Sequence, residues 1–450
     1  MVAAARFAML SKTGVGAFCL MILCAVSSRP ARAEAEPLIL DLQTGLALVQ
    51  ENNERLLQAR IDLLRGREEL RVARAAGLPQ VDASFTYSRN WLLPSFVFAG
   101  NAVRIGTENN LTGVLSVRQP LYAGGRIRAT EDMARRQFAM LGETERQTTQ
   151  LVLAEVEERF YDLLLAEELR TVSHLALAWA RRNLAQVEAR AQAGRAAELD
   201  QLRAQVQVSN MRADSISAEN NLRLATMAFK DVVGLDLDQA IEVRGTFRTE
   251  TTLDLDDLDA LVALGLTKRP ELAHVEQEIG WHERKIAADQ ASTRPSVELV
   301  AAGQTQFQSD EFDLADREWR KSWNTGLVVQ MPLFDGRLTG ARVAQARQDL
   351  RRIEYDHQRI AREVRLQIQQ AYYAVEEASQ RIEAHRDAVL QAEKGLEVAE
   401  LRYTSGVGTQ LENLDAQLAL VEARTQSAVA RRDKALALMG LEQTVGVLGE

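Results

Sequence analysis

Hydrophobic residues follow a helical period over much of the chain. A seam of apolar and small residues in steps of three and four comprises Ile368, Ala371, Val375, Ala378, Ile382, His385, Val389, Ala392, Leu396, Ala399 and Tyr403. This spacing predicts a coiled coil. Beyond Gly406 and Gly408 the same spacing resumes, at Leu411, Leu414, Leu418 and Val421. Because glycine adopts the backbone conformations of tight turns, we expect a helical hairpin with its tip at these glycines.

A period of two occupies four shorter segments. Apolar and polar residues alternate over about 80–90, 108–122, 295–308 and 321–334. Alternation over about ten residues is typical of transmembrane β-strands, although a half-buried hairpin of a soluble domain shows it too. Trp91, Trp319 and Trp323 lie in or beside the loops that join these strands, where membrane-interface aromatics are expected.

The order of these elements occurs twice. Pro79 pairs with Pro295, Gly194 with Gly406, and QPLYAGGR (119–126) with MPLFDGR (331–337). The stretches 121–269 and 333–450 contain no proline and are free to form long helices. We therefore predict a mostly helical fold with a small β part. Its parts are a first repeat at 34–234 (hairpin about 126–232, tip near 194), a linker at 235–269, and a second repeat at 270–450 (hairpin about 338–440, tip near 406).

The N-terminus has the pattern of a secretory signal. Arg6 and Lys12 precede an apolar run, and Ala31-Arg32-Ala33 offers a cleavage site, so we predict a signal peptide at 1–33, with a retained anchor as the weaker alternative. Both cysteines of the sequence lie inside this segment. Its removal takes away four basic residues and no acid, which changes the net charge from −9 to −13. An acidic exported chain argues against nucleic acid as a partner.

Four strands are too few for a closed barrel, which needs about eight. If the strands cross a membrane, the chain must therefore oligomerise, as a dimer with eight strands or a trimer with twelve. The spacing of residues leaves both open.

The chain resembles the TolC-type outer-membrane efflux proteins. The resemblance rests on the duplication, the two strand-to-helix motifs, RPEL at 269–272 and YTSGVGTQLENLDA at 403–416. It implies a homotrimer, with a 12-stranded β-barrel surrounded by outer-membrane lipid and continued by a 12-helix α-barrel through the periplasm. It also implies a passive export duct that works with a periplasmic adaptor protein and an inner-membrane pump of the RND, ABC or MFS type. The cargo, whether drugs, metal ions or polypeptides, stays open.

The same resemblance implies site residues at the hairpin tips. Glu412 and Asp415 match a pair of carboxylates that rings the pore constriction. Tyr403, Asp200 and Arg203 match gating positions, although Arg203 stands in the first repeat where the second has Asp415. Gly194, Gly406 and Gly408 match the surface that docks the adaptor. Gly408 stands where the family often has a basic residue, and Asn53-Glu54 replaces the usual N-P.

Spacing alone supports part of this assignment. Glu412 and Asp415 are three residues apart and therefore lie on one helical face, as they would on a solvated helix end. Six such carboxylates in a trimer would repel one another by about 1.7 kcal/mol per pair at about 10 Å and a dielectric of about 20. We expect a cation-selective constriction that polyvalent cations block.

Other candidates carry less weight. His274, Glu278 and His282 share a helix face, but the histidines are about 12 Å apart along the axis, so a polar helix face is favoured over a zinc site. His385 fits a packed core position, and SDEFDLAD (309–316) fits a solvated loop better than a calcium site. The chain shows no nucleophile elbow, P-loop or G-x-G-x-x-G motif, so we expect no catalytic residue, cofactor or resident metal. A periplasmic adaptor or a structural coiled coil is disfavoured by the two hairpins and the alternating strands.

Overall fold

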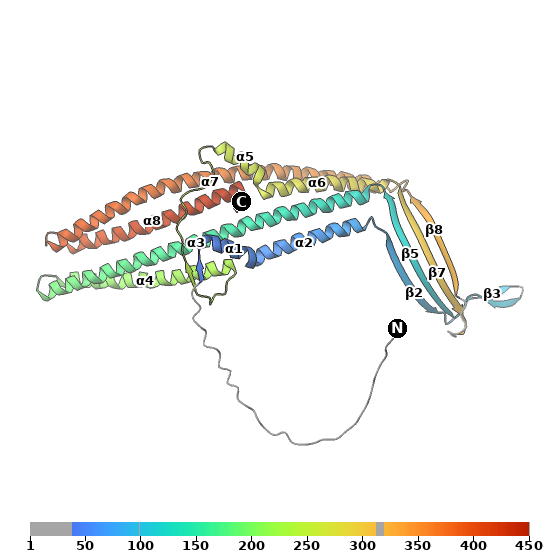
Figure 1. Cartoon of the computed structure of the whole chain (residues 1–450), viewed down its shortest axis with the longest axis horizontal. Coiled ribbons are helices and arrows are strands. Elements are labelled where there is room, and N and C mark those ends of the chain that lie inside the picture. The colour runs from blue at the N-terminus through green and yellow to red at the C-terminus, as the bar shows by residue number, and fades with distance from the viewer. Residues whose placement is uncertain (1–37, 99, 312–318, 450) are drawn as a thin grey trace, which may run out of the picture.

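The computed structural model describes residues 38–98, 100–311 and 319–449. The predicted signal peptide and most of the acidic segment 309–316 lie outside the described residues. Two long helical hairpins run side by side with their tips at one end, and a β-sheet lies at the opposite end (Figure 1).

The hairpins of the two repeats have equal dimensions. Helices α3 (Arg126–Gln192) and α7 (Leu338–Thr404) have 67 residues each, and α4 (Glu198–Val233) and α8 (Gln410–Val445) have 36 each. A helix of 67 residues is about 100 Å long at 1.5 Å per residue. None of the helices in the described ranges combines the length and the apolar character needed to cross a membrane.

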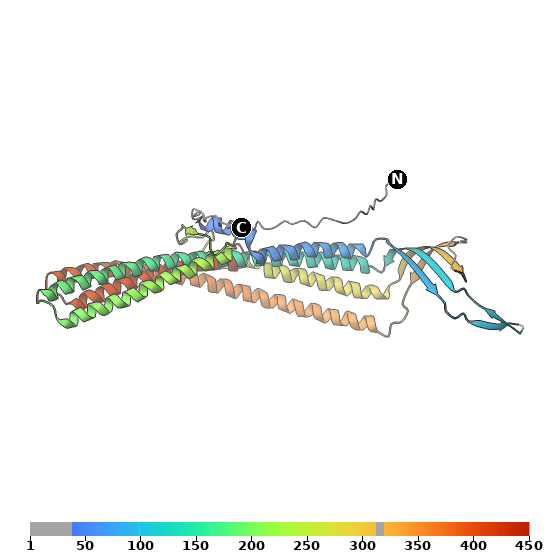
Figure 2. The ribbon, with the colours of Figure 1, turned by 90° about the horizontal axis from the view of Figure 1, so that it is seen from below.

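Shorter helices complete the bundle toward the sheet. Helix α2 (Glu54–Ala75) packs on α3, and α6 (Pro270–Gln290) packs between α3 and α7 (Figures 1 and 2). Each follows an 11-residue helix, α1 (Leu42–Asn52) or α5 (Leu258–Lys268). Proline begins α6, whereas at the start of α2 the side chain of Asn53 accepts hydrogen bonds from the N–H groups of Arg55 and Leu56. The departure Asn53-Glu54 therefore preserves a capped helix start.

The sheet contains four antiparallel strands in the order β2-β5-β7-β8. Their bounds are Gln80–Arg89, Asn109–Ala123, Ser296–Ser309 and Arg320–Gln330. The register places Phe85 opposite Gly113 and Leu115 opposite Gly303, so the odd-numbered apolar residues share one face. Ser84, Val114 and Gln304 lie across from one another on the other face, which is more polar. The predicted alternation is thus present in the folded strands.

Some elements are absent from the sequence-based prediction. A small hairpin of β3 (Ser95–Phe98) and β4 (Asn101–Arg104) extends the loop between β2 and β5. Strand β1 (Leu38–Leu40) pairs in parallel with β6 (Ile241–Val243), which lies inside the segment 235–269 together with α5. Three or four residues are too few to show a period, so pairing with a partner strand decides their conformation.

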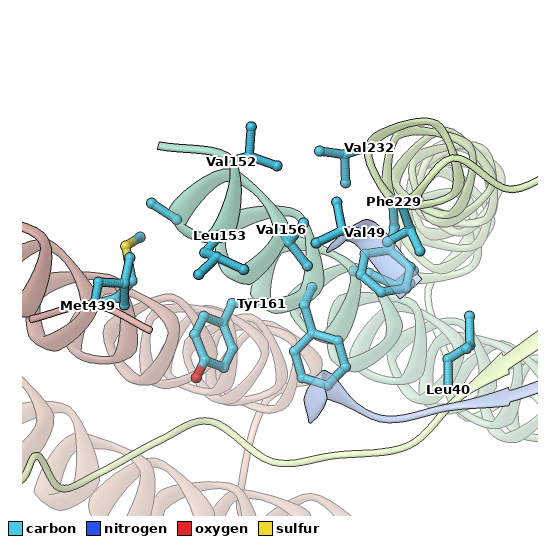
Figure 3. Packing of buried hydrophobic residues seen from close by; sticks show 14 of the residues in the cluster. Leu40, Val49, Val152, Leu153, Val156, Tyr161, Phe229, Val232 and Met439 are labelled. Carbon is cyan, nitrogen blue, oxygen red and sulfur yellow. The ribbon is translucent and has the colours of Figure 1, made fainter. Parts of the chain in front are cut away.

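The hydrophobic core lies at mid-length, where the short segments cross the hairpins. Figure 3 shows Val49 of α1, Val156 of α3 and Phe229 of α4 pointing toward one another beside Leu40 of β1. The second repeat builds the matching cluster from α5, α7 and α8, with Ile368, Leu438 and Leu441 among its buried residues. Burying each such side chain contributes about 1.5–3 kcal/mol. The first cluster also includes Met439 of α8, so the two hairpins are joined to each other at mid-length (Figure 3).

The predicted seam of α7 is confirmed up to the tip. Ile368, Val375, Ala378, Leu396 and Tyr403 are buried, and His385 is half-buried.

Its predicted continuation on α8 is wrong in part. Leu411 and Leu418 are exposed, while Gln410, Asn413 and Gln417 are buried beside Leu414. Helix α8 packs against both α7 and α3, so its buried stripe is rotated from the one that a two-helix hairpin predicts. The interior behind the tip is therefore polar.

Candidate functional site

Each hairpin turns on a glycine in the left-handed conformation. Gly194 has φ +70° and Gly406 has φ +79°. In the first turn the N–H of Arg195 donates to the carbonyl of Arg190 (2.8 Å), and in the second the N–H of Val407 donates to the carbonyl of Arg402 (3.0 Å). These bonds satisfy helix-terminal carbonyl groups, and a side chain at either glycine would strain the turn. The predicted tips near 194 and 406 are where the chain reverses.

Gly408 is required for close approach. A Cβ at this position would lie 2.9 Å from the Cβ of Arg402 and 3.1 Å from the backbone nitrogen of Tyr403. The N–H of Gly408 donates to the carbonyl of Arg402 (2.9 Å), which holds the loop against the end of α7. A basic side chain cannot stand here unless the turn shifts.

Arg190 of α3 supplies a basic group at the tip instead. Its Nη2 donates to the carbonyl of Tyr403 (3.1 Å), and its guanidinium lies 4.1 Å from the centre of the Tyr403 ring. Tyr403 is 7% exposed, so this contact is shielded from water. A cation–π contact of this kind contributes about 0.5–2 kcal/mol. Nothing in the sequence distinguishes Arg190, because it is one of many arginines on α3.

A second link joins the two hairpins at the turn. The Nε2 of Gln410, at the start of α8, donates to the carbonyl of Asp200 in the first turn of α4 (3.0 Å). The backbone of Asp200 therefore makes this contact. Arg203 is exposed one turn further along α4.

A polar cavity of about 140 Å³ lies between the hairpins behind the tip. Its lining comprises Trp179, Arg182, Asn183, Gln186, Glu400, Tyr403, Thr404, Asn413 and Gln417. Asn183 and Asn413 are each 3% exposed, and among the described protein atoms neither polar atom of Asn183 has a hydrogen-bond partner. Buried amides of this kind are satisfied by water, for which the cavity has room. The hairpins thus meet near the tip around a small polar cavity.

The two candidate carboxylates are exposed on α8. Glu412 Oε2 lies 3.7 Å from Nε of Arg402, and both side chains are about half-exposed. Such a pair contributes about 0–1 kcal/mol. The buried residues Asn413 and Leu414 separate the carboxylates from the interior of the bundle, so Glu412 and Asp415 face away from the hairpin contact. Thr409 caps the helix that carries them by accepting from the N–H of Glu412 (3.2 Å).

The zinc candidates His274, Glu278 and His282 all lie on α6. His282 is buried, its ring stands edge-on to Trp281 at 4.9 Å, and burial lowers its pKa. Within residues 38–98, 100–311 and 319–449, no group of three histidine, cysteine or acidic side chains is arranged to hold a metal ion.

The aromatic candidates lie at the loop end of the sheet. Trp91 follows β2, Trp319 precedes β8 with its ring 5.8 Å from that of Phe307, and Trp323 lies within β8. Trp91 and Trp323 are largely exposed.

A duplicated strand pair and long helical hairpin, with an apolar sheet face at one end and polar tips at the other, define the outer-membrane efflux channel class. The chain belongs to the outer membrane efflux protein family, whose profile matches residues 46–235 and 261–447. Its location is the outer membrane of a Gram-negative envelope.

Relatives match over most of the chain. Outer membrane protein OprJ of Pseudomonas aeruginosa is 26% identical over 89% of this chain and 84% of its own length. Alkaline protease secretion protein AprF of the same species is 24% identical over 91% and 85%. The solved structure of the outer membrane protein VceC from Vibrio cholerae has a TM-score of 0.77 and 18% identity, over 90% of this chain and 96% of that one. The described fold is therefore that of these channels.

Proposed function

We propose that this protein is the passive exit duct of a tripartite export system. The observation that carries the proposal is the separation of the sheet from the tips by helices of 67 residues, about 100 Å. A sheet in the outer membrane would place the tips deep in the periplasm, within reach of a periplasmic adaptor and an inner-membrane pump of the RND, ABC or MFS type. The segment 1–33 would direct export and be removed.

The proposed assembly is a homotrimer. In the single chain β2 and β8 each have one neighbouring strand in the sheet, and pairing between copies would join twelve strands into one barrel. The hairpins of three copies would continue it as a 12-helix α-barrel. Exposed apolar residues on α4 and α8 support contacts between copies: Leu199, Leu202, Val206, Leu411 and Leu418. Trp91, Trp319 and Trp323 would lie at the membrane interface.

The tips would form both the gate and the docking surface. Six carboxylates from Glu412 and Asp415 would ring the entrance. The contact of Arg190 with Tyr403 would hold the two hairpins of each protomer together and so keep the entrance closed. The Gln410–Asp200 link joins the same turns, and Arg203 lies exposed beside them. The turns at Gly194, Gly406 and Gly408 would meet the adaptor, since they are the ends of both hairpins.

The cargo can be identified by a genetic experiment. Relatives include a protein named for alkaline protease secretion and one named for a toluene efflux pump, so polypeptides and organic compounds are both candidates, with metal ions as a third. The experiment is deletion of the gene, followed by growth on dyes, detergents, antibiotics and metal salts and an assay of secreted proteins.

Sensitivity to several unrelated organic compounds, restored by the wild-type gene, would assign a multidrug pump. Sensitivity to metals alone would assign metal efflux. A missing secreted polypeptide would assign type I secretion. Normal growth on the whole panel with normal secretion would contradict the proposed export function.

A further inference from the structure

The apolar face of the sheet is hollowed over Gly303. Strand β7 places Gly303 between Leu115 of β5 and Trp323 of β8. Gly303 has no side chain, and no neighbouring side chain covers it, because an added Cβ would meet no atom within 4 Å. The middle of this face is therefore open. The resulting groove of about 530 Å³ reaches from Trp323 to Phe85, whose side chains are 82% and 77% exposed.

A second glycine on the same face is covered. A Cβ at Gly113 would lie 2.7 Å from Cε1 of Phe85, so the ring of Phe85 lies over Gly113. The ring of Phe85 thus forms one wall of the groove, Trp323 forms the other, and Gly303 is the floor between them. Leu115 and Ala83 complete an apolar lining.

The groove has one polar end. Lys321 lies opposite Thr305, and both residues line the groove. Because β8 begins at Arg320, Lys321 is at the loop end of the sheet, remote from the helices (Figure 1). Lys321 is exposed, and among the described residues it forms no ion pair.

We propose that this groove binds one acyl chain of a phosphate-bearing lipid of the outer membrane. The ammonium group of Lys321 pairs with the lipid phosphate, and the hydroxyl of Thr305 donates a hydrogen bond to it. The acyl chain lies over Gly303 between Phe85 and Trp323. Lipid is the occupant because the protein is located in the outer membrane, the floor is apolar, and the single cation stands at the end where headgroups are expected. The site lies within one chain, so it depends on neither the gate nor the export cargo.

The test is the lipid that the purified protein retains. The protein is extracted in mild detergent, and bound lipid is measured by native mass spectrometry. The wild type is expected to retain one phosphate-bearing lipid per protomer. Lys321→Gln should lower retention about fivefold, which corresponds to about 1 kcal/mol for one lysine near an anionic surface. Gly303→Leu fills the groove and should lower retention by more than about tenfold, because it displaces several methylene groups.

A matched control is available on the other face of the sheet. Gly326 lies opposite Val300, and a Cβ there would meet Val300 Cγ2 at 3.9 Å, so Gly326→Leu adds the same bulk away from the groove. Gly326→Leu and Lys321→Arg should both retain the lipid. Measured masses distinguish a glycerophospholipid from a phosphorylated saccharide lipid, and either one supports the site.

Equal retention by the wild type and Gly303→Leu would overturn the proposal, as would retention of neutral lipids alone. If Gly303→Leu fails to insert into the membrane, Lys321→Gln decides, because its exposed side chain is not needed for packing. If Lys321→Gln then retained as much lipid as the wild type, both the phosphate contact and the proposed lipid site would be wrong.

Discussion

The guanidinium of Arg190 lies 4.1 Å from the ring centre of Tyr403 and donates to the carbonyl of the same residue. This contact ties the first hairpin to the second beside the proposed entrance. We predict that Arg190→Gln loosens the closed entrance by about 1 kcal/mol per protomer, the scale of a cation–π contact. Planar-bilayer recordings should show a higher open probability. The open probability of Arg190→Lys should lie between those of the wild type and Arg190→Gln, because lysine keeps the charge but lacks the planar group that stacks on the ring.

Arg195 provides the control for this prediction. It is exposed at the turn of the first hairpin, so Arg195→Gln makes the same charge change at the tip. Equal changes in open probability in the Arg190 and Arg195 variants would mean that tip charge alone matters and that the stacked contact does not hold the entrance.

Gly408 gives a second prediction, on docking. Gly408→Ala forces the turn away from Arg402, at a cost of about 1–3 kcal/mol for an overpacked contact. We expect weaker binding to the cognate adaptor in a pull-down or by surface plasmon resonance. In Gly395→Ala, the added Cβ in the interior of α7 meets no atom within 4 Å. That control should bind normally and be more stable by up to about 1 kcal/mol. Normal binding by Gly408→Ala would remove this turn from the docking surface.

Glu157 gives a prediction on pH. Burial raises the pKa of this carboxyl above its ordinary value of 4.5, and the nearby Glu442 acts in the same direction while Arg248 opposes it. A raised pKa in the folded state means that the stabilising contribution of Glu157 is fully present below pH 4.5 and is lost as the pH rises through the folded value. Glu157→Gln should therefore unfold at a higher temperature than the wild type at pH 8, with a smaller difference at pH 4.

The exposed neighbour Glu158 is the control for the pH series. The difference in unfolding temperature from the wild type should change more between pH 4 and pH 8 for Glu157→Gln than for Glu158→Gln, because Glu157 is buried and Glu158 is exposed. An equal change in the two variants would show that the burial of Glu157 does not disfavour the charged form.

The sequence predicts the parts of the fold that repeat over many residues. The heptad from Ile368 to Tyr403 matches the buried face of α7, and the period of two in the strands matches their two faces. Both patterns can be predicted from the sequence, because the same rule, an apolar residue on the buried face, recurs at every helical or strand period. The polar stripe of α8 could not be predicted, because it depends on contacts with the other hairpin: Gln410 donates to the carbonyl of Asp200 on α4, and Gln417 lines the cavity against α3.

The sequence predicts where the hairpin tips lie but not which residues contact one another there. Gly194 and Gly406 identify the turns, because few residues other than glycine adopt their backbone conformation. The partner of Tyr403 was not predictable. Arg190 lies 213 positions away in sequence, and one of many arginines on α3 becomes special only when two hairpins are placed side by side.

The central claim is that Glu412 and Asp415 ring the entrance of a duct, and block of single channels by polyvalent cations tests it most directly. Block by a trivalent cation added on the side of the tips should occur in the wild type and disappear in Glu412→Gln with Asp415→Asn. A matched control, Glu383→Gln with Asp387→Asn, removes two exposed acids from α7 at a distance from its tip and should leave the block in place. Unchanged block in the Glu412/Asp415 variant would contradict the claim.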